Sequence, residues 1–238
     1  MNYIKSICLK PGYDPGRYPF NIPAVRHLEK AGRLTLEKPV TFFVGENGTG
    51  KSTLIEAIAV AMGFNGEGGS RDFSFSTQDT HSQLCQYLTV GKSIRSTDGF
   101  FLRAESFYNT ASYLDENSNM SRYGGVSFHK QSHGEAFLAL AVHRFEGNGL
   151  YILDEPESAL SPQRLMSLLV IIHELVKNDS QFIIATHSPI LMAYPNADIL
   201  EFSENGIQKV SYRETEHYKI TKQFIDMPER MVGYLLRD

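Results

Sequence analysis

The segment that most constrains the fold is Phe43-Val44-Gly45-Glu46-Asn47-Gly48-Thr49-Gly50-Lys51-Ser52-Thr53. It matches the pattern G-x-x-x-x-G-K-[ST]. An apolar run over 40–44 precedes it as an expected buried strand, and apolar residues at helical spacing follow over 54–61. A strand, a glycine-rich turn and a helix in this order place backbone N–H groups around a phosphate at a helix N-terminus. An ordinary glycine-rich turn is the alternative, but the lysine and hydroxyl in register favour phosphate binding.

The pattern assigns a role to most of its residues. We expect Lys51 to reach the β- and γ-phosphates of a nucleotide and the Ser52 hydroxyl to ligate Mg²⁺. The expected nucleotide-binding residues are Gly45, Asn47, Gly48, Thr49, Gly50, Lys51, Ser52 and Thr53.

Two adjacent carboxylates, Asp154 and Glu155, end a second apolar run over 150–153. A buried parallel strand presents such residues at its C-terminal edge, where open α/β sheets bind ligands. There Asp154 is expected to hold Mg²⁺ together with Ser52. Glu155 is expected to act as a general base on the attacking water, an effect worth ~10² to 10⁴ in rate. Solvated turn residues are the alternative, and the phosphate loop argues against it.

Two further segments carry candidate residues. His187 ends a third apolar run that begins at Gln181, which predicts a γ-phosphate contact, although a lone histidine at a strand end is often structural. Ser132 precedes an apolar helical run over 136–142, and Glu135 follows it by three residues. This pattern is typical both of a capping box and of a helix N-terminus that binds a second anion, and the residues alone leave both open.

The other segments predict a β-rich N-terminal portion, an irregular middle and a helical end. Among the aromatic residues of the loop-like stretch Pro11 to Pro23, Tyr13, Tyr18 and Phe20 are candidates to stack on an adenine ring, with packing under the loop as the alternative. The expected elements are strands at 3–10, 34–36, 99–104, 199–202 and 207–212, short helical structure at 83–90, a helix from Pro162, and a helical stretch over 217–236 interrupted at Pro228; no motif includes His217.

Composition restricts the classes of protein and of site. The chain has 238 residues, 42% of them hydrophobic and 21% charged, which is typical of a globular protein. A net charge of −4 supplies no general attraction for nucleic acid. Cys8 and Cys85 lie far apart, and the sequence shows neither a secretory segment nor a run of 18 apolar residues, so we expect a reduced, cytoplasmic protein without membrane insertion. His129 and His133 lack a third ligand for zinc.

Four motifs in order, GENGTGKST, QSHGE, LYILDEPESALSP and IIATHSP, resemble those of ABC-type ATPases. The chain is most similar to the small soluble members often labelled AAA-family, which are related to the SMC and RecF-like branch. The resemblance covers nearly the whole chain and implies an α/β P-loop NTPase with an ABC-ATPase-like core sheet, an antiparallel β portion and a small inserted lid. The expected organisation is one domain over 1–238, with the core at about 1–62 and 128–238 and the irregular stretch at about 63–127 as the lid.

The resemblance also implies roles for single residues. Glu155 corresponds to the catalytic glutamate and His187 to the switch histidine, while Ser132 and Gly134 correspond to a signature that contacts the γ-phosphate held by another protomer. An ATP-dependent homodimer enclosing two ATP molecules would follow. His133 replaces the first glycine of that signature and Glu135 its glutamine. For the lid glutamine, position favours Glu105, with Gln78 and Gln83 as alternatives.

The sequence therefore predicts a Mg²⁺-dependent ATPase whose hydrolysis opens a homodimer and switches an unknown protein partner. One alternative is a slowly hydrolysing, nucleotide-gated binding module for a defence or repair effector. Another is the nucleotide-binding subunit of a separate membrane transporter, whose pore would be a different chain. Direct nucleic-acid binding also stays open, without support from the net charge.

Overall fold

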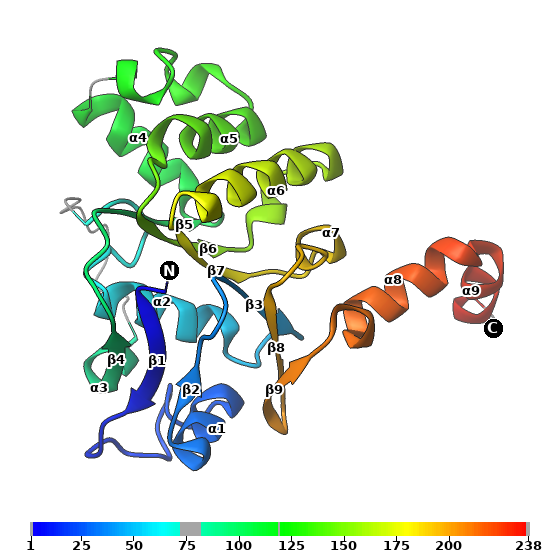
Figure 1. Cartoon of the computed structure of the whole chain (residues 1–238). Coiled ribbons are helices and arrows are strands. Elements are labelled where there is room, and N and C mark those ends of the chain that lie inside the picture. Colours follow the sequence, from blue (N-terminus) through cyan, green and yellow to red (C-terminus); the bar gives the residue numbers. More distant parts are fainter. Residues whose placement is uncertain (1, 72–81, 119, 237–238) are drawn as a thin grey trace.

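The computed structural model describes residues 2–71, 82–118 and 120–236. In these ranges a six-stranded sheet forms the centre of the molecule, in the order β5-β6-β7-β3-β8-β9 (Figure 1). All neighbours are parallel except β8 and β9, which form an antiparallel pair. The strands are β3 (Val40–Gly45), β5 (Asp98–Arg103), β6 (Gly149–Asp154), β7 (Gln181–Ala185), β8 (Asp198–Ser203) and β9 (Gly206–Val210).

The apolar runs of the sequence form the inner strands because both faces of the sheet are covered. Every residue of β3, β6 and β7 is buried. Phe42 and Val44 of β3 pack into one core and Phe43 into the other, as the period of two in a strand requires. The parallel register pairs Asp154 with Ala185 and Phe43 with Ala185, so the carboxyl ends of these strands lie at one edge.

Helices α4, α5 and α6 cover one face of the sheet, and α2, α1 and a smaller sheet cover the other. The smaller sheet is antiparallel, in the order β2-β1-β4, and supplies the predicted antiparallel β portion. The remaining elements are β1 (Ile4–Leu9), β2 (Leu34–Thr35), β4 (Leu88–Lys92), α1 (Pro23–Ala31), α2 (Lys51–Ala61), α3 (Leu84–Tyr87), α4 (Phe107–Asn117), α5 (His133–Arg144), α6 (Pro162–Lys177) and α7 (Pro189–Met192). This architecture confirms the predicted α/β fold.

The structure differs from the predicted elements in three places. Helix α1 follows the loop that ends at Pro23, and it forms because Ala24, Val25 and Leu28 pack one face into the core. The helix expected over 83–90 stops at Tyr87, because the following residues pair with β1 as strand β4. Helix α4 forms in the region expected to be irregular. Within 63–127, strand β4 belongs to the smaller sheet and strand β5 to the central sheet. An inserted lid in this range therefore stays a prediction.

The C-terminal helices α8 (Glu216–Asp226) and α9 (Pro228–Leu235) extend away from the central sheet (Figure 1). Pro228 lies at the start of α9, where the sequence predicts the interruption. The structure describes both helices completely, and none of their residues is buried. Large apolar side chains such as Ile225 and Leu235 are 69% and 73% exposed. Elsewhere in the described part of the chain, too, the structure contains no helix long and apolar enough to cross a membrane.

Candidate nucleotide-binding site

The phosphate loop connects β3 to α2, and two of its glycines are required by the backbone. Gly45 has φ 126°, and a Cβ there would lie 2.0 Å from the Phe202 carbonyl oxygen of β8. Gly50 has φ 101°, and its Cβ would lie 2.7 Å from Ile22 Cδ1. L-residues with a side chain rarely adopt such angles, so the glycines of the motif are required for the loop to form.

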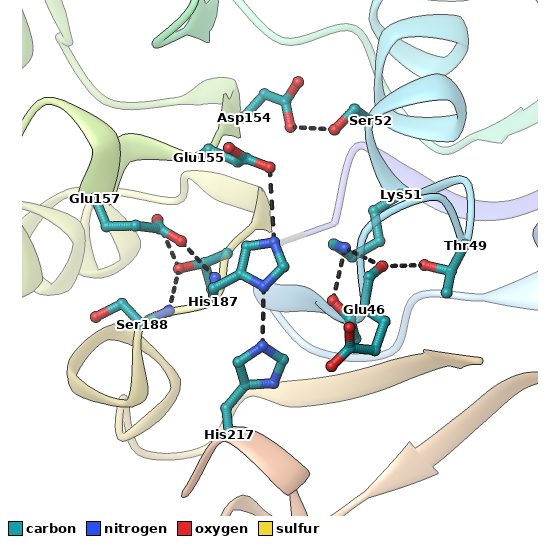
Figure 2. A network of polar contacts seen from close by, with 12 residues as sticks. Glu46, Thr49, Lys51, Ser52, Asp154, Glu155, Glu157, His187, Ser188 and His217 are labelled. Carbon is teal, nitrogen blue, oxygen red and sulfur yellow. Dashed lines mark hydrogen bonds and ion pairs between the residues drawn. The ribbon is translucent and has the colours of Figure 1, made fainter. Parts of the chain in front are cut away.

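Lys51 begins α2 and is almost completely buried, at 4% exposure. Its Nζ donates to the carbonyl oxygens of Gly45 at 2.7 Å and Glu46 at 2.8 Å, while Thr49 Oγ1 donates to the same Glu46 oxygen (Figure 2). Burial lowers the pKa of Lys51, and nearby carboxylates, first Glu155, oppose that shift. A cavity of about 620 Å³ opens beside this loop.

Ser52 and Asp154, 102 positions apart, meet at the edge of the sheet. The Ser52 hydroxyl donates to Asp154 Oδ1 at 3.2 Å. Burial raises the pKa of Asp154 to about 6, and Arg103, whose Nε lies 3.5 Å from Oδ2, partly offsets this effect. A hydroxyl beside a buried carboxylate is a donor set of the kind that holds Mg²⁺ with a bound phosphate, so these two residues fit the ion.

Glu155 follows the end of β6, His187 follows the end of the neighbouring strand β7, and their side chains face each other. Glu155 adopts a left-handed conformation with φ 51°, and its backbone N–H donates to the Ala185 carbonyl oxygen at 3.0 Å. His187 Nε2 lies 3.6 Å from Glu155 Oε1 (Figure 2). Burial lowers the pKa of His187, and the positive charge of Lys51 adds to the shift, so the neutral imidazole is favoured.

Three residues of the site were not among the predicted site residues. Glu157 accepts from Thr186 Oγ1 at 2.8 Å and from the backbone N–H of His187, so it fixes the strand end that carries this histidine. His217 Nε2 lies 2.9 Å from His187 Nδ1. A lone histidine 30 positions after His187 has no spacing that would predict this contact. Arg103 was also missed, although its position beside Glu105 at the end of β5 places it at the same sheet edge.

The structure does not bring the signature residues to the phosphate loop of the same chain. Ser132 begins α5 as part of a capping box, donating through both its backbone N–H and its hydroxyl to Glu135 Oε2. Arg164 of α6 donates to Ser132 Oγ at 3.3 Å. A Cβ on Gly134 would lie 2.6 Å from Arg164 Nη1 and 2.7 Å from the Ala159 carbonyl oxygen, so close packing explains this glycine.

The lid candidates lie in different surroundings. Glu105 is 83% exposed and lies 3.4 Å from Arg103 Nη2, which connects it to Asp154 through one guanidinium. Gln83 is exposed just before α3. Gln78 lies outside the described residues. Of the two described candidates, Glu105 is thus the one that a guanidinium connects to the carboxyl end of β6.

The three aromatic candidates separate into packing and exposed residues. Tyr13 and Phe20 stack on each other with centroids 4.6 Å apart, and both contact Tyr87 edge-on. Tyr18 is 62% exposed, and its hydroxyl lies 3.5 Å from Thr53 Oγ1 at the end of the motif. Of the three candidates, Tyr18 is the exposed one beside the loop, so stacking on a base stays a prediction for this residue.

Two family models match parts of the chain. Residues 81–193 match the model described as "AAA domain, putative AbiEii toxin, Type IV TA system", and residues 22–122 match one described as "AAA domain". A comparison with curated proteins found no match.

Solved structures with the same fold include cbiO1 from Clostridium perfringens, described as part of the ABC transporter complex cbiONQ. It has a TM-score of 0.51 and 17% identity, with 99% of each chain covered. A bacterial Atm1-family ABC exporter with ATP bound has a TM-score of 0.50 and 14% identity, covering 92% of this chain and 42% of the exporter. The SMC head domain from Thermotoga maritima aligns over 88% of this chain and 99% of its own, with 18% identity and a TM-score of 0.46.

The fold and the phosphate loop define a P-loop NTPase with the ABC-type architecture. The two family matches support the resemblance of its motifs to those of small ABC-type, AAA-labelled ATPases.

Proposed function

We propose that this protein binds ATP with Mg²⁺ and hydrolyses it to ADP and phosphate. The observation that supports this most strongly is the meeting of the phosphate loop, the Ser52–Asp154 pair and the Glu155–His187 pair at the carboxyl edge of β3, β6 and β7. Phosphoryl transfer to water requires a lysine, ligands for a divalent ion, a general base and a hydrogen-bond donor for the γ-phosphate.

Each residue has a defined task in this mechanism. Lys51 would exchange its carbonyl contacts for phosphate oxygens, and Ser52 and Asp154 would hold Mg²⁺, which neutralises phosphate charge when bound. Glu155 accepts the proton of the attacking water, and His187, neutral because it is buried, donates from Nε2 toward the γ-phosphate. Hydrolysis then depends mainly on positioning and on charge compensation.

Steady-state phosphate release by the wild type and three variants tests this function. The wild type should release phosphate only with Mg²⁺, and Glu155→Gln should bind ATP normally but hydrolyse it ~10² to 10⁴ times more slowly, because its general base is lost. Lys51→Ala should lose nucleotide binding. Lys177→Ala, which changes an exposed lysine of α6, is the control and should match the wild type. Full turnover by Lys51→Ala would overturn the assignment of the phosphate loop.

The resemblance and the exposed position of Ser132 support a cytoplasmic, ATP-dependent homodimer. In it Ser132 and Gly134 at the start of α5 would contact the nucleotide of the second protomer. Nucleotide state would then control the contact with a protein partner. Roles as a transporter subunit or in nucleic-acid binding have less support. The first is suggested only by the description of a structural neighbour, and the second has no support from the net charge of −4.

A slow-hydrolysing, nucleotide-gated module for a protein effector is the second candidate. The exposed apolar side chains of α8 and α9 favour it, since such surfaces commonly contact other proteins. The same phosphate-release assay separates the two candidates: rapid turnover without any partner supports the ATPase switch and opposes the slow module.

A further inference from the structure

His187 is held between two groups on opposite sides of its ring. Nε2 lies 3.6 Å from Glu155 Oε1, and Nδ1 lies 2.9 Å from His217 Nε2 (Figure 2). The two imidazole rings have centroids 5.0 Å apart and are tilted by 53°. His217 belongs to the first turn of α8, so this contact joins the γ-phosphate side of the site to the start of the C-terminal helices.

The start of α8 is itself held in place. Thr215 is fully buried at its N-cap, accepts from the Tyr218 N–H at 3.3 Å and donates to the Tyr212 carbonyl oxygen at 2.8 Å. The backbone N–H of Glu216 donates to Glu201 Oε1 of β8 at 3.3 Å. These contacts fix the backbone on both sides of His217, so its ring is presented to His187 from a defined position.

The hydrogen between the two rings can belong to either histidine, and two observations decide which. The Glu155 carboxylate can only accept when ionised, which favours a hydrogen on His187 Nε2 and leaves His187 Nδ1 as an acceptor. His217 must then donate from Nε2, and its Nδ1 carries no hydrogen.

The surroundings of His217 Nδ1 lead to the same assignment. This atom is buried and has no hydrogen-bond partner among the described residues. If His187 donated instead, His217 would carry a buried N–H without an acceptor, and orphaned buried N–H groups are rarer than under-used acceptors. Burial lowers the pKa of both histidines, which agrees with two neutral rings.

We infer that His217 is a positioning residue, which donates from Nε2 to His187 Nδ1 and so holds His187 as the Nε2–H tautomer with this N–H directed toward the reacting phosphate. Its catalytic consequence depends on the proposed ATPase function, whereas the tautomer does not. The same hydrogen bond couples the first turn of α8 to the group that would contact the γ-phosphate.

Nitrogen-15 NMR of the imidazole groups tests the tautomer in nucleotide-free protein. We expect His187 in the wild type to show a protonated Nε2 and an unprotonated Nδ1. His217→Phe keeps a ring but removes the donor and should give a mixture of tautomers. His217→Gln places an amide N–H where Nε2 was and should restore the wild-type pattern. Unchanged His187 tautomers in His217→Phe would overturn the inference.

ATP turnover provides the second readout. His217→Phe should lower kcat about 10-fold with little change in KM, as for hydrogen-bond partners that orient other functional histidines, and His217→Gln should recover most of it. Equal loss in both variants would mean that only packing matters and would overturn the inference. His143→Gln, an exposed histidine at the far end of α5, is the control, and melting curves verify folding.

The two proposals fail in different ways. A wild type without hydrolysis would contradict the proposed function, while the NMR pattern would still decide the role of His217.

Discussion

At the scale of single residues, the buried carboxylate of Asp154 lowers the free energy of unfolding when it is ionised. Burial raises its pKa from 3.8 to about 6, and Glu155 adds repulsion. The folded protein therefore holds the Asp154 proton more tightly than the unfolded chain does. Stability is then lost as pH rises from about 4 to about 6, because ionisation is easier in the unfolded state.

Asp154→Asn should therefore stabilise the nucleotide-free protein. The amide keeps the shape and a contact to Ser52 without a buried charge, so the free energy of unfolding should rise by about 1–3 kcal/mol above pH 6. Below pH 4 the gain should vanish. Urea unfolding at pH 4, 6 and 8 measures it.

Glu105→Gln is the matched control, because it changes an exposed carboxylate beside the same Arg103. This variant should unfold like the wild type at each pH. A gain from Asp154→Asn that did not change with pH would contradict the assigned cause.

At the scale of elements, one carboxylate connects three segments at the start of β5. Asp98 accepts from Arg144 Nη1 at the end of α5 and from the Tyr151 hydroxyl of β6, each at 2.6 Å, and from the Glu146 N–H at 3.1 Å. Burial alone would raise the pKa of Asp98, but the hydrogen bonds from Tyr151 and Arg144 outweigh it and hold this pKa below its usual value. The resulting stability is present above about pH 4 and is lost as pH falls through the folded pKa.

Asp98→Asn should lower the free energy of unfolding by about 2–4 kcal/mol at pH 7, because it leaves the mostly buried Arg144 without its counter-charge. The difference from the wild type should shrink in acid, where Asp98 itself is protonated. Urea unfolding at pH 7 and pH 3 measures both effects. Glu174→Gln, in an exposed pair with Lys177, is the control and should leave unfolding unchanged. A loss from Asp98→Asn that stayed the same at pH 3 would argue for packing instead of charge.

At the scale of the whole molecule, the signature at the start of α5 and the phosphate loop have no described contact with each other, which is the arrangement a composite dimer requires. Light scattering of Glu155→Gln should show a monomer without nucleotide and a dimer with Mg²⁺ and ATP, because slow hydrolysis traps the closed state. Adding Ser132→Arg, which places a bulky charge on the exposed start of α5, should keep the protein monomeric. An unchanged mass despite demonstrated ATP binding would mean that the altered signature does not close a homodimer.

Local patterns in the sequence were enough to predict the phosphate loop, the buried strands and the edge of the sheet. Gly45, Gly50 and Lys51 lie in one loop of the chain, so their spacing alone predicts a phosphate-binding loop. Ser52 and Asp154 are far apart in sequence, but the carboxyl ends of parallel strands meet at one edge, and this rule predicts their contact.

Only the tertiary structure decided which distant side chains complete the site. The strand order brings Arg103 of β5 next to Asp154, although no motif contains this arginine. The contacts that hold the start of α8 place His217 beside His187. Pairing with β1 makes the residues after Tyr87 a strand, β4. Helix periodicity and motif spacing describe neighbours along the chain, whereas these contacts depend on how separate elements pack. Local sequence was therefore enough to predict the residues of the phosphate loop. The tertiary structure was needed to place His217 beside His187 and Arg103 beside Asp154.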